Sequence, residues 1–232
     1  MQAAARTDVG MVREQNEDAF YIGDNVFAVA DGMGGHDAGE VASGIAVRML
    51  RENKFNGADP EGWLRAVISE INAEIFRQAS INPGYAGMGT TLTVLIIEGN
   101  RAYLGHVGDS RAYLLRDGML RQLTDDHSVV GELLKRGVLT REEARFHPQR
   151  NIITRALGTF PQVDIDISSL DTRVGDRVLL CTDGLTSAVS DQELADILLS
   201  THDPNQACNT LIDEANKRGG YDNTTVVVVY CS

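Results

Sequence analysis

Short apolar runs rich in β-branched residues constrain the fold of this chain of 232 residues more than any other feature. Residues 177–181 (RVLLC) and 225–230 (TVVVVY) carry little polar interruption, and such runs are typical of strands that are covered on both faces. Residues 26–30 (VFAVA) form another apolar run. We therefore expect β-strands inside the molecule, with further layers on both sides of them.

Two pairs of strand-like runs predict β-hairpins. Each pair is separated by three residues that include glycine, and the Asp-Gly of the second connection suits a tight turn. The pairs are residues 91–97 and 101–107, joined by EGN, and residues 111–115 and 119–123, joined by RDG. Hairpins predict antiparallel rather than parallel pairing.

Amphipathic helices separate the strand-like runs. In residues 61–79, apolar residues recur three and four positions apart, and Asp59 followed by Pro60 supplies an N-cap and a preformed first turn. The other expected helices are residues 40–50, 191–199 and 204–217. Strands in runs and helices in pairs, without regular alternation, favour an α+β layered fold over a doubly wound parallel sheet.

Residues 125–158 differ from the rest of the chain. They are polar, with helical character near 129–136 and 140–146, and we interpret them as an excursion from the layers. No linker rich in Pro, Gly or Ser divides the sequence, and no internal repeat is present. We expect residues 1–232 to form a single domain.

The net charge of −12 excludes general binding to nucleic acid or to anionic membranes, because both need a basic surface. The three cysteines, Cys181, Cys208 and Cys231, are widely spaced and contain no CxxC pair, which argues against disulfides and against a thiolate zinc site. The N-terminal residues lack a signal peptide, and no apolar stretch is long enough to cross a bilayer. We expect a cytoplasmic protein.

Acidic residues recur at the ends of the apolar runs, each with a glycine nearby. A single Asp-Gly is usually a turn, but carboxylates at the ends of neighbouring strands can meet in one cleft, where a divalent cation relieves their repulsion. Oxygen ligands without Cys or His indicate Mg²⁺ or Mn²⁺, and the glycines allow a carbonyl such as that of Gly32 to approach. The residues are Asp31, Asp109, Asp183 and Asp222, with a further acidic pair at Glu17 and Asp18.

Arg13 lies just before that acidic pair in VREQNEDAF. A guanidinium beside carboxylate-bound metals is suited to hold a phosphate through two hydrogen bonds. The alternative is an ordinary surface ion pair with Glu14 or Glu17. Metals and a phosphate ligand together favour metal-assisted hydrolysis by a water molecule whose pKa is lowered.

The sequence resembles the metal-dependent serine/threonine protein phosphatases of type 2C, the PPM family, in their compact bacterial form. The matching motifs follow one another along the whole chain, and DGMGG and GDSR are fairly specific by themselves. They are TDVGMVREQNEDAF (7–20), VADGMGGHDAGEVAS (29–43), MGTTLTV (88–94), HVGDSRAYLLRDG (106–118), LTDDHS (123–128), HPQRNIITRALG (147–158), GDRVLLCTDGL (175–185) and GGYDNTTVVVV (219–229).

The resemblance implies a four-layer α-β-β-α sandwich of two antiparallel sheets flanked by helix pairs, with two Mn²⁺ or Mg²⁺ ions at one end. Asp31 would then bridge the two ions. Asp183 and Asp222 would complete the coordination of the first ion, and the carbonyl of Gly32 would help to hold the second ion. The segment 125–158 would be a flap beside the active site.

The resemblance also implies roles around these metals. Glu17 and Asp18 would hold metal-bound waters, and Asp109 with Asp183 would bind a possible third ion. Arg13 would bind the substrate phosphate. Many eukaryotic members carry a histidine after the Asp-Gly pair as general acid, whereas this sequence has Met33. His36 lies nearby, but we interpret it as a helix N-terminal or loop residue without a catalytic part, and a metal-bound water could act as the acid instead.

The implied activity is direct hydrolysis of phosphoserine and phosphothreonine in proteins, by a metal-bridging water and without a phosphoenzyme. The expected partners are phosphoprotein substrates and a cognate bacterial Ser/Thr kinase, with the phosphatase acting as a monomer. Two alternatives remain open at this point. One is a non-catalytic regulator on the same fold, and the other is a stress-response phosphatase acting on a small phosphoserine protein.

Overall fold

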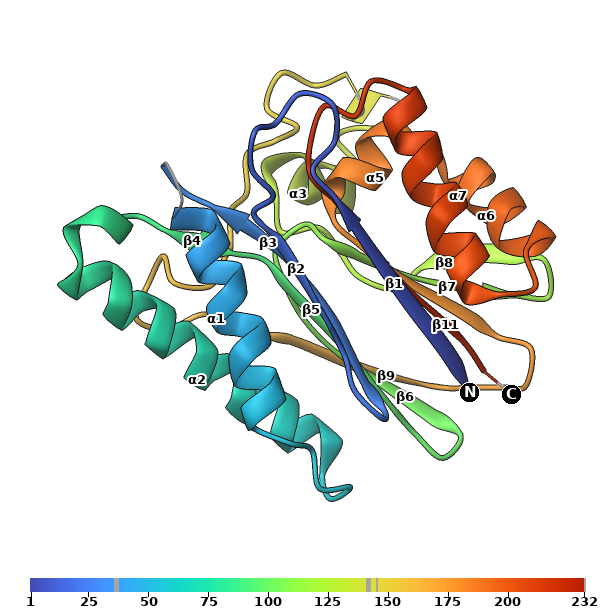
Figure 1. Cartoon of the computed structure of the whole chain (residues 1–232), viewed down its shortest axis with the longest axis horizontal. Coiled ribbons are helices and arrows are strands. Elements are labelled where there is room, and N and C mark those ends of the chain that lie inside the picture. Colours follow the sequence, from blue (N-terminus) through green and yellow to red (C-terminus); the bar gives the residue numbers. More distant parts are fainter. Residues whose placement is uncertain (36–37, 141–142, 145, 232) are drawn as a thin grey trace.

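A computed structural model describes residues 1–35, 38–140, 143–144 and 146–231. Two antiparallel sheets lie face to face in the middle, with α1 and α2 covering one sheet and α5, α6 and α7 covering the other (Figure 1). The predicted four-layer sandwich is thereby confirmed. Residue 36 and part of the predicted helix 140–146 lie outside the described residues, so the expectations for His36 and for that helix have no structural counterpart.

The first sheet has the order β1-β11-β10-β7-β8. Its strands are β1 (Gln2–Asp8), β11 (Thr224–Tyr230), β10 (Arg177–Cys181), β7 (Arg111–Arg116) and β8 (Met119–Gln122). The two most apolar runs of the sequence are β10 and β11, and they occupy inner positions, as predicted. Asp117 and Gly118, both with positive φ (51° and 77°), form the predicted tight turn between β7 and β8.

The second sheet has the order β2-β3-β5-β6-β9, with β4 paired to the end of β3. Its strands are β2 (Asp18–Ile22), β3 (Val26–Met33), β4 (Gly89–Thr90), β5 (Leu92–Glu98), β6 (Arg101–Val107) and β9 (Asp166–Asp171). The predicted hairpin of β5 and β6 is confirmed by the pairing of Glu98 with Arg101.

The helices match most of the predicted ranges. They are α1 (Ala38–Glu52), α2 (Pro60–Ile81), the short 3-10 helix η1 (Pro83–Tyr85), α3 (Val129–Lys135), α5 (Asp183–Ala188), α6 (Asp191–Ser200) and α7 (Pro204–Lys217). Asp59 caps α2 through a hydrogen bond from the Gly62 amide, with Pro60 in the first turn, as the sequence indicates. Ser190 and Glu193 form a capping box at the start of α6.

Three apolar layers hold the sandwich together. Successive side chains of each strand point to opposite faces of the sheet. On β11, Val226 and Val228 pack toward α5–α7, while Val227 and Val229 pack between the two sheets. The other face of the second sheet packs against α1 and α2. Burial on both faces explains why the inner strands lack polar alternation.

The structure corrects one expectation about the sheet. Asp31 is not the last residue of its strand, because β3 continues through Gly32 to Met33. Asp31 lies opposite Asp18 of β2, and Gly32 lies opposite Thr90 of β4. Pairing on both sides therefore extends the strand across residues that have low β propensity.

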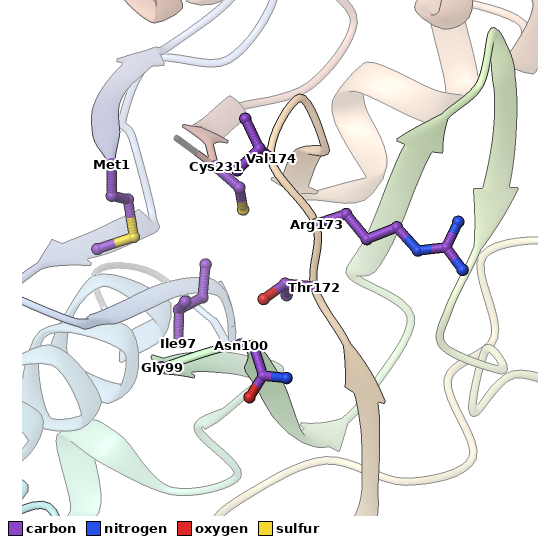
Figure 2. A pocket seen from close by; sticks show the side chains of 8 residues that line it. All are labelled: Met1, Ile97, Gly99, Asn100, Thr172, Arg173, Val174 and Cys231. Carbon is purple, nitrogen blue, oxygen red and sulfur yellow. The ribbon is translucent and has the colours of Figure 1, made fainter.

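The two ends of the strands differ in character. Beside Gln2 and Tyr230, which are register partners, Met1, Ile97 and Cys231 line a pocket of about 160 Å³ (Figure 2). The opposite end of the same strands carries Asp8 and Thr224 and leads to the predicted site. Among the described residues, no helix is both long and apolar enough to span a membrane.

Candidate metal centre

Five aspartates from both sheets gather at one end of the sandwich. Asp18 begins β2 and faces Asp31 on β3, while Asp183 is the first residue of α5, directly after β10. Asp109 lies in the β6–β7 turn, and Asp222 lies two residues before β11. The strand-end pattern of the sequence thus located residues that the fold brings together.

The electrostatics of these carboxylates show how close they are. Burial, followed by the charges of Asp18, Asp183, Asp109 and Asp222, raises the pKa of Asp31 well above its ordinary value. Burial is also the first cause at the other positions, where it raises the pKa of Asp18 to about 7, that of Asp109 to about 8 and that of Asp183 to about 6. Negative charge is therefore costly here unless a cation compensates it.

Two buried oxygens in this cluster accept no hydrogen bond. They are Oδ1 of Asp18 and Oδ1 of Asp109, and the third such side-chain atom of the described residues is Oδ1 of Asn216. Buried carboxylate oxygens without partners fit a site for hard divalent cations, which bind oxygen ligands. Within the described ranges, no three or more His, Cys, Asp or Glu side chains are arranged so that they could hold a metal ion.

Gly32 allows a close approach of backbone segments beside the cluster. A Cβ at this position would collide with the carbonyl oxygens of Gly39 and Glu17. The Gly32 amide donates to the Glu17 carbonyl (3.1 Å), and the Ser43 hydroxyl donates to the same oxygen (2.6 Å). The backbone of Gly32 is thus fixed next to Asp31.

Asn223 holds the chain segment that leads to Glu17 in place. The Asn223 side chain accepts from the Glu17 amide (2.8 Å) and donates to the carbonyls of Val9 (3.0 Å) and Gln15 (2.9 Å). The carboxylate of Glu17 lies against Gly39 at the start of α1. No role was predicted for Asn223, and its position directly after Asp222 was the available indication.

Two threonines also organise the carboxylates and were not predicted. Thr182 donates from its hydroxyl to Oδ2 of Asp18 (2.8 Å). The Thr91 hydroxyl accepts from the Asp31 amide (2.9 Å). Thr182 lies within the motif CTDG and Thr91 within GTT, but nothing in the spacing of these motifs indicates the contacts.

Arg13 joins the cluster through an ion pair with Asp222. Its guanidinium donates to Oδ2 of Asp222 at 2.9 Å, and both side chains are partly exposed, 52% and 37%. Among the alternatives considered from the sequence, the charge of Glu17 also raises the pKa of Arg13, after the effects of Asp222. The arginine therefore lies at the solvent-facing edge of the carboxylates.

The start of the segment 125–158 is bound to the Asp109 turn. The His127 amide donates to the Gly108 carbonyl (2.8 Å), and the Gly108 amide donates to Nδ1 of His127 (3.0 Å). Arg111 forms a close ion pair with Asp126 (2.6 Å). The start of the segment thus lies beside the carboxylate cluster, as expected of the predicted flap.

A layered sandwich of two antiparallel sheets with carboxylates gathered at one end of the strands is the arrangement that the resemblance in the motifs implies. The family described as protein phosphatase 2C matches residues 12–220, and the chain belongs to this family. It is therefore a protein phosphatase, that is, a phosphoric monoester hydrolase. The resemblance seen in the motifs is confirmed.

Bacterial relatives match nearly the whole chain. The serine/threonine phosphatase stp of Listeria monocytogenes is 43% identical over 240 residues, covering 99% of this chain and 95% of that protein. The crystal structure of the Mycobacterium tuberculosis phosphatase PstP/Ppp has a TM-score of 0.94 and 44% identity, covering 100% of this chain and 98% of that one. A second structure, the PstP catalytic domain with two manganese ions, has a TM-score of 0.91 and 43% identity, with coverage of 98% and 96%.

Proposed function

We propose that this chain hydrolyses phosphoserine and phosphothreonine esters in proteins with the help of two Mn²⁺ or Mg²⁺ ions. The observation that carries the proposal is the cluster of five aspartates in which two buried oxygens, Oδ1 of Asp18 and of Asp109, lack partners. Relatives named serine/threonine phosphatases, and the PstP catalytic domain with two manganese ions, support the substrate and the metal.

The proposed ligands of the first two ions are Asp31, Asp183, Asp222 and the carbonyl of Gly32. Glu17 and Asp18 would orient metal-bound waters, and Asp109 with Asp183 would take a third ion. When bound, the ions supply a water nucleophile of lowered pKa and compensate the charge of the phosphoryl oxygens. The hydroxyl of Thr182 keeps Asp18 oriented during this chemistry.

Arg13 is proposed to bind the substrate phosphate. Its guanidinium has further donors besides the one that contacts Asp222, and its half-exposed position allows a phosphate on a protein surface to reach it. Holding the phosphate there would place phosphorus beside the carboxylate cluster and orient the ester oxygen outward.

We propose the same cellular setting as the sequence predicted. Residues 1–232 would form one phosphatase domain, supported by the pairing of the first strand with the last, β1 with β11. The three cysteines are free thiols, which fits a reducing cytoplasm. The proposed partners are phosphoproteins and a cognate Ser/Thr kinase whose phosphorylation the monomeric enzyme reverses, with no nucleic acid bound.

The first test is phosphate release from a phosphothreonine peptide with Mn²⁺, with Mg²⁺ and with EDTA. We expect release to require the metal and to be lost in Asp31→Asn and in Asp183→Asn, with both variants folded by circular dichroism. Asp24→Asn, an exposed aspartate outside the cluster, is the matched control and should keep wild-type turnover. Wild-type turnover in Asp31→Asn would overturn the metal assignment.

A further inference from the structure

Three exposed apolar side chains flank the ion pair of Arg13 and Asp222. Met11, Val12 and Tyr221 are 71%, 60% and 74% exposed. They precede Arg13 and Asp222 directly in the sequence, and we call them the apolar rim. Exposed apolar side chains of this size are costly when grouped, and a group beside a binding site indicates contact with a ligand.

The apolar rim stands on two loops that are docked against each other. The Met11 amide donates to the Gly220 carbonyl at 2.7 Å, and a Cβ at Gly10 would lie 2.6 Å from the carbonyl oxygens of Gly220 and Asp222. The loop after β1 and the loop before β11 consequently lie side by side (Figure 1). Only glycine permits this approach at Gly10, whose φ is +80°.

Glycines also place the rim side chains. Gly219 has a φ of +120°, and a Cβ there would lie 2.5 Å from the ring of Tyr221. Gly220 has a φ of +51°, and its Cβ would lie 2.8 Å from Cγ of Met11. Tyr221 and Met11 therefore pack over glycines on a fixed backbone, while most of each side chain faces solvent. The rim is a preorganised surface, which lowers the entropic cost of binding.

Two other exposed apolar side chains lie away from Arg13 and Asp222. Val174 is 85% exposed and Met119 is 73% exposed. Val174 lines the pocket at the other end of the strands, and Met119 begins β8. Exposed apolar residues are normal on protein surfaces, and these two provide controls at a distance from the rim.

We propose that the apolar rim binds an apolar side chain of the phosphoprotein substrate, within one position of the phosphorylated residue. The inference rests on the proposed function, because it takes Arg13 as the phosphate ligand. Because Met11 and Val12 precede Arg13, and Tyr221 precedes its ion-pair partner Asp222, a substrate phosphate at Arg13 would bring the neighbouring substrate residues close to these side chains. An apolar substrate residue there buries apolar surface of its own and of the rim, and this burial stabilises the complex. A polar substrate residue does not provide this stabilisation.

The test compares two phosphothreonine peptides, with Leu or with Ser on both sides of the phosphothreonine. The readout is the ratio of their kcat/KM values within each variant, which is independent of overall activity. Wild type should favour the Leu peptide about fivefold or more, as expected for partial burial of one such side chain. The double variant Met11→Ala with Tyr221→Ala should bring the ratio close to one, and Val174→Ala should keep the wild-type ratio.

A binding measurement separates this inference from the proposed activity. In the Asp31→Asn background, fluorescence anisotropy with both labelled peptides should show tighter binding of the Leu peptide, again lost with the two rim substitutions. A ratio near one in wild type, or an unchanged ratio in the rim variant, overturns the inference while the phosphatase activity stands. If turnover is absent but the Leu peptide still binds more tightly, the proposed activity is wrong and the inference about the apolar rim stands.

Discussion

At the scale of single residues, this protein places like charges together and compensates them only in part with its own side chains, as in the ion pair of Arg13 with Asp222. Asp18 and Asp31 face each other across two paired strands, and burial further raises the pKa of both. The same carboxylates that make the chain suited to bind cations thus cost stability when no cation is bound. Removing one of them separates the two effects.

We predict that Asp109→Asn stabilises the metal-free protein and weakens its response to metal. At pH 8 in EDTA, the neutral side chain removes a repelling charge, and Tm should rise by at least about 3 °C, the shift that ~1 kcal/mol produces in a chain of this length. The gain in Tm on adding Mn²⁺ should be smaller than in wild type. Scanning calorimetry tests both, and a lower Tm in EDTA would contradict the prediction.

Arg13→Ala tests the phosphate ligand. Loss of the charge-assisted hydrogen bonds should raise KM for a phosphopeptide about tenfold, the effect of roughly 1.4 kcal/mol. Mn²⁺ affinity, measured by calorimetric titration, should stay within about threefold because the ligands remain. Arg121→Ala, another exposed arginine, is the control. An unchanged kcat/KM would remove Arg13 from the phosphate site.

At the scale of elements, the sequence predicted what depends on local patterns. The inner strands, the two hairpins and the four long helices follow from apolar spacing and from turn residues. The strand β1 (QAAARTD) is rich in Ala and polar residues, so that only its pairing with β11 identifies it. The edge strand β9 and the six-residue helix α5 are likewise too short or too polar for periodicity to show them.

The same limit applies to the candidate site. Strand-end aspartates are visible as a repeated local pattern, so Asp109, Asp183 and Asp222 could be found from the sequence. Asn223 acts through contacts with residues more than 200 positions away, and no local pattern encodes them. Asp31 was found for a partly wrong reason, because its strand continues beyond it.

Gly32→Ala tests how the end of β3 is built. A methyl group there meets two backbone carbonyls, and overpacking of this kind costs about 1–3 kcal/mol of the free energy of unfolding. Gly44→Ala is the matched control, because Gly44 is an exposed position of α1 with no atom within 4 Å of an added Cβ. It should stabilise by about 0.5–1 kcal/mol. Urea denaturation of both variants gives the comparison, and equal stabilities would refute the close approach.

At the scale of the whole molecule, the carboxylate cluster links stability to metal and to pH. We expect EDTA to lower Tm and Mn²⁺ to restore it, because cations bind the folded state and relieve its repulsion. The metal-free protein should also lose stability as the pH rises from about 6.5 to about 8.5. Measurement of Tm across this range, with EDTA and with Mn²⁺, tests both expectations.

The loss of stability with rising pH follows from the raised pKa values of the buried aspartates. Asp18 and Asp109, with pKa values of about 7 and about 8, release their protons in the folded state within this range. Their unfolded forms, with a pKa near the ordinary ~3.9, are already ionised. The folded state therefore binds more protons, and raising the pH favours unfolding. A Tm in EDTA that rises with pH would contradict this.

The antiparallel pairing of the first strand with the last has a consequence for engineering. Gln2 and Tyr230 are register partners, and both ends of the chain emerge at the corner away from the carboxylates (Figure 1). A short linker could therefore join the ends, and new termini could be opened in the exposed connection around Gly57, between α1 and α2. Such a circular permutant would keep every strand pair and carry its free ends beside the helical layer of α1 and α2.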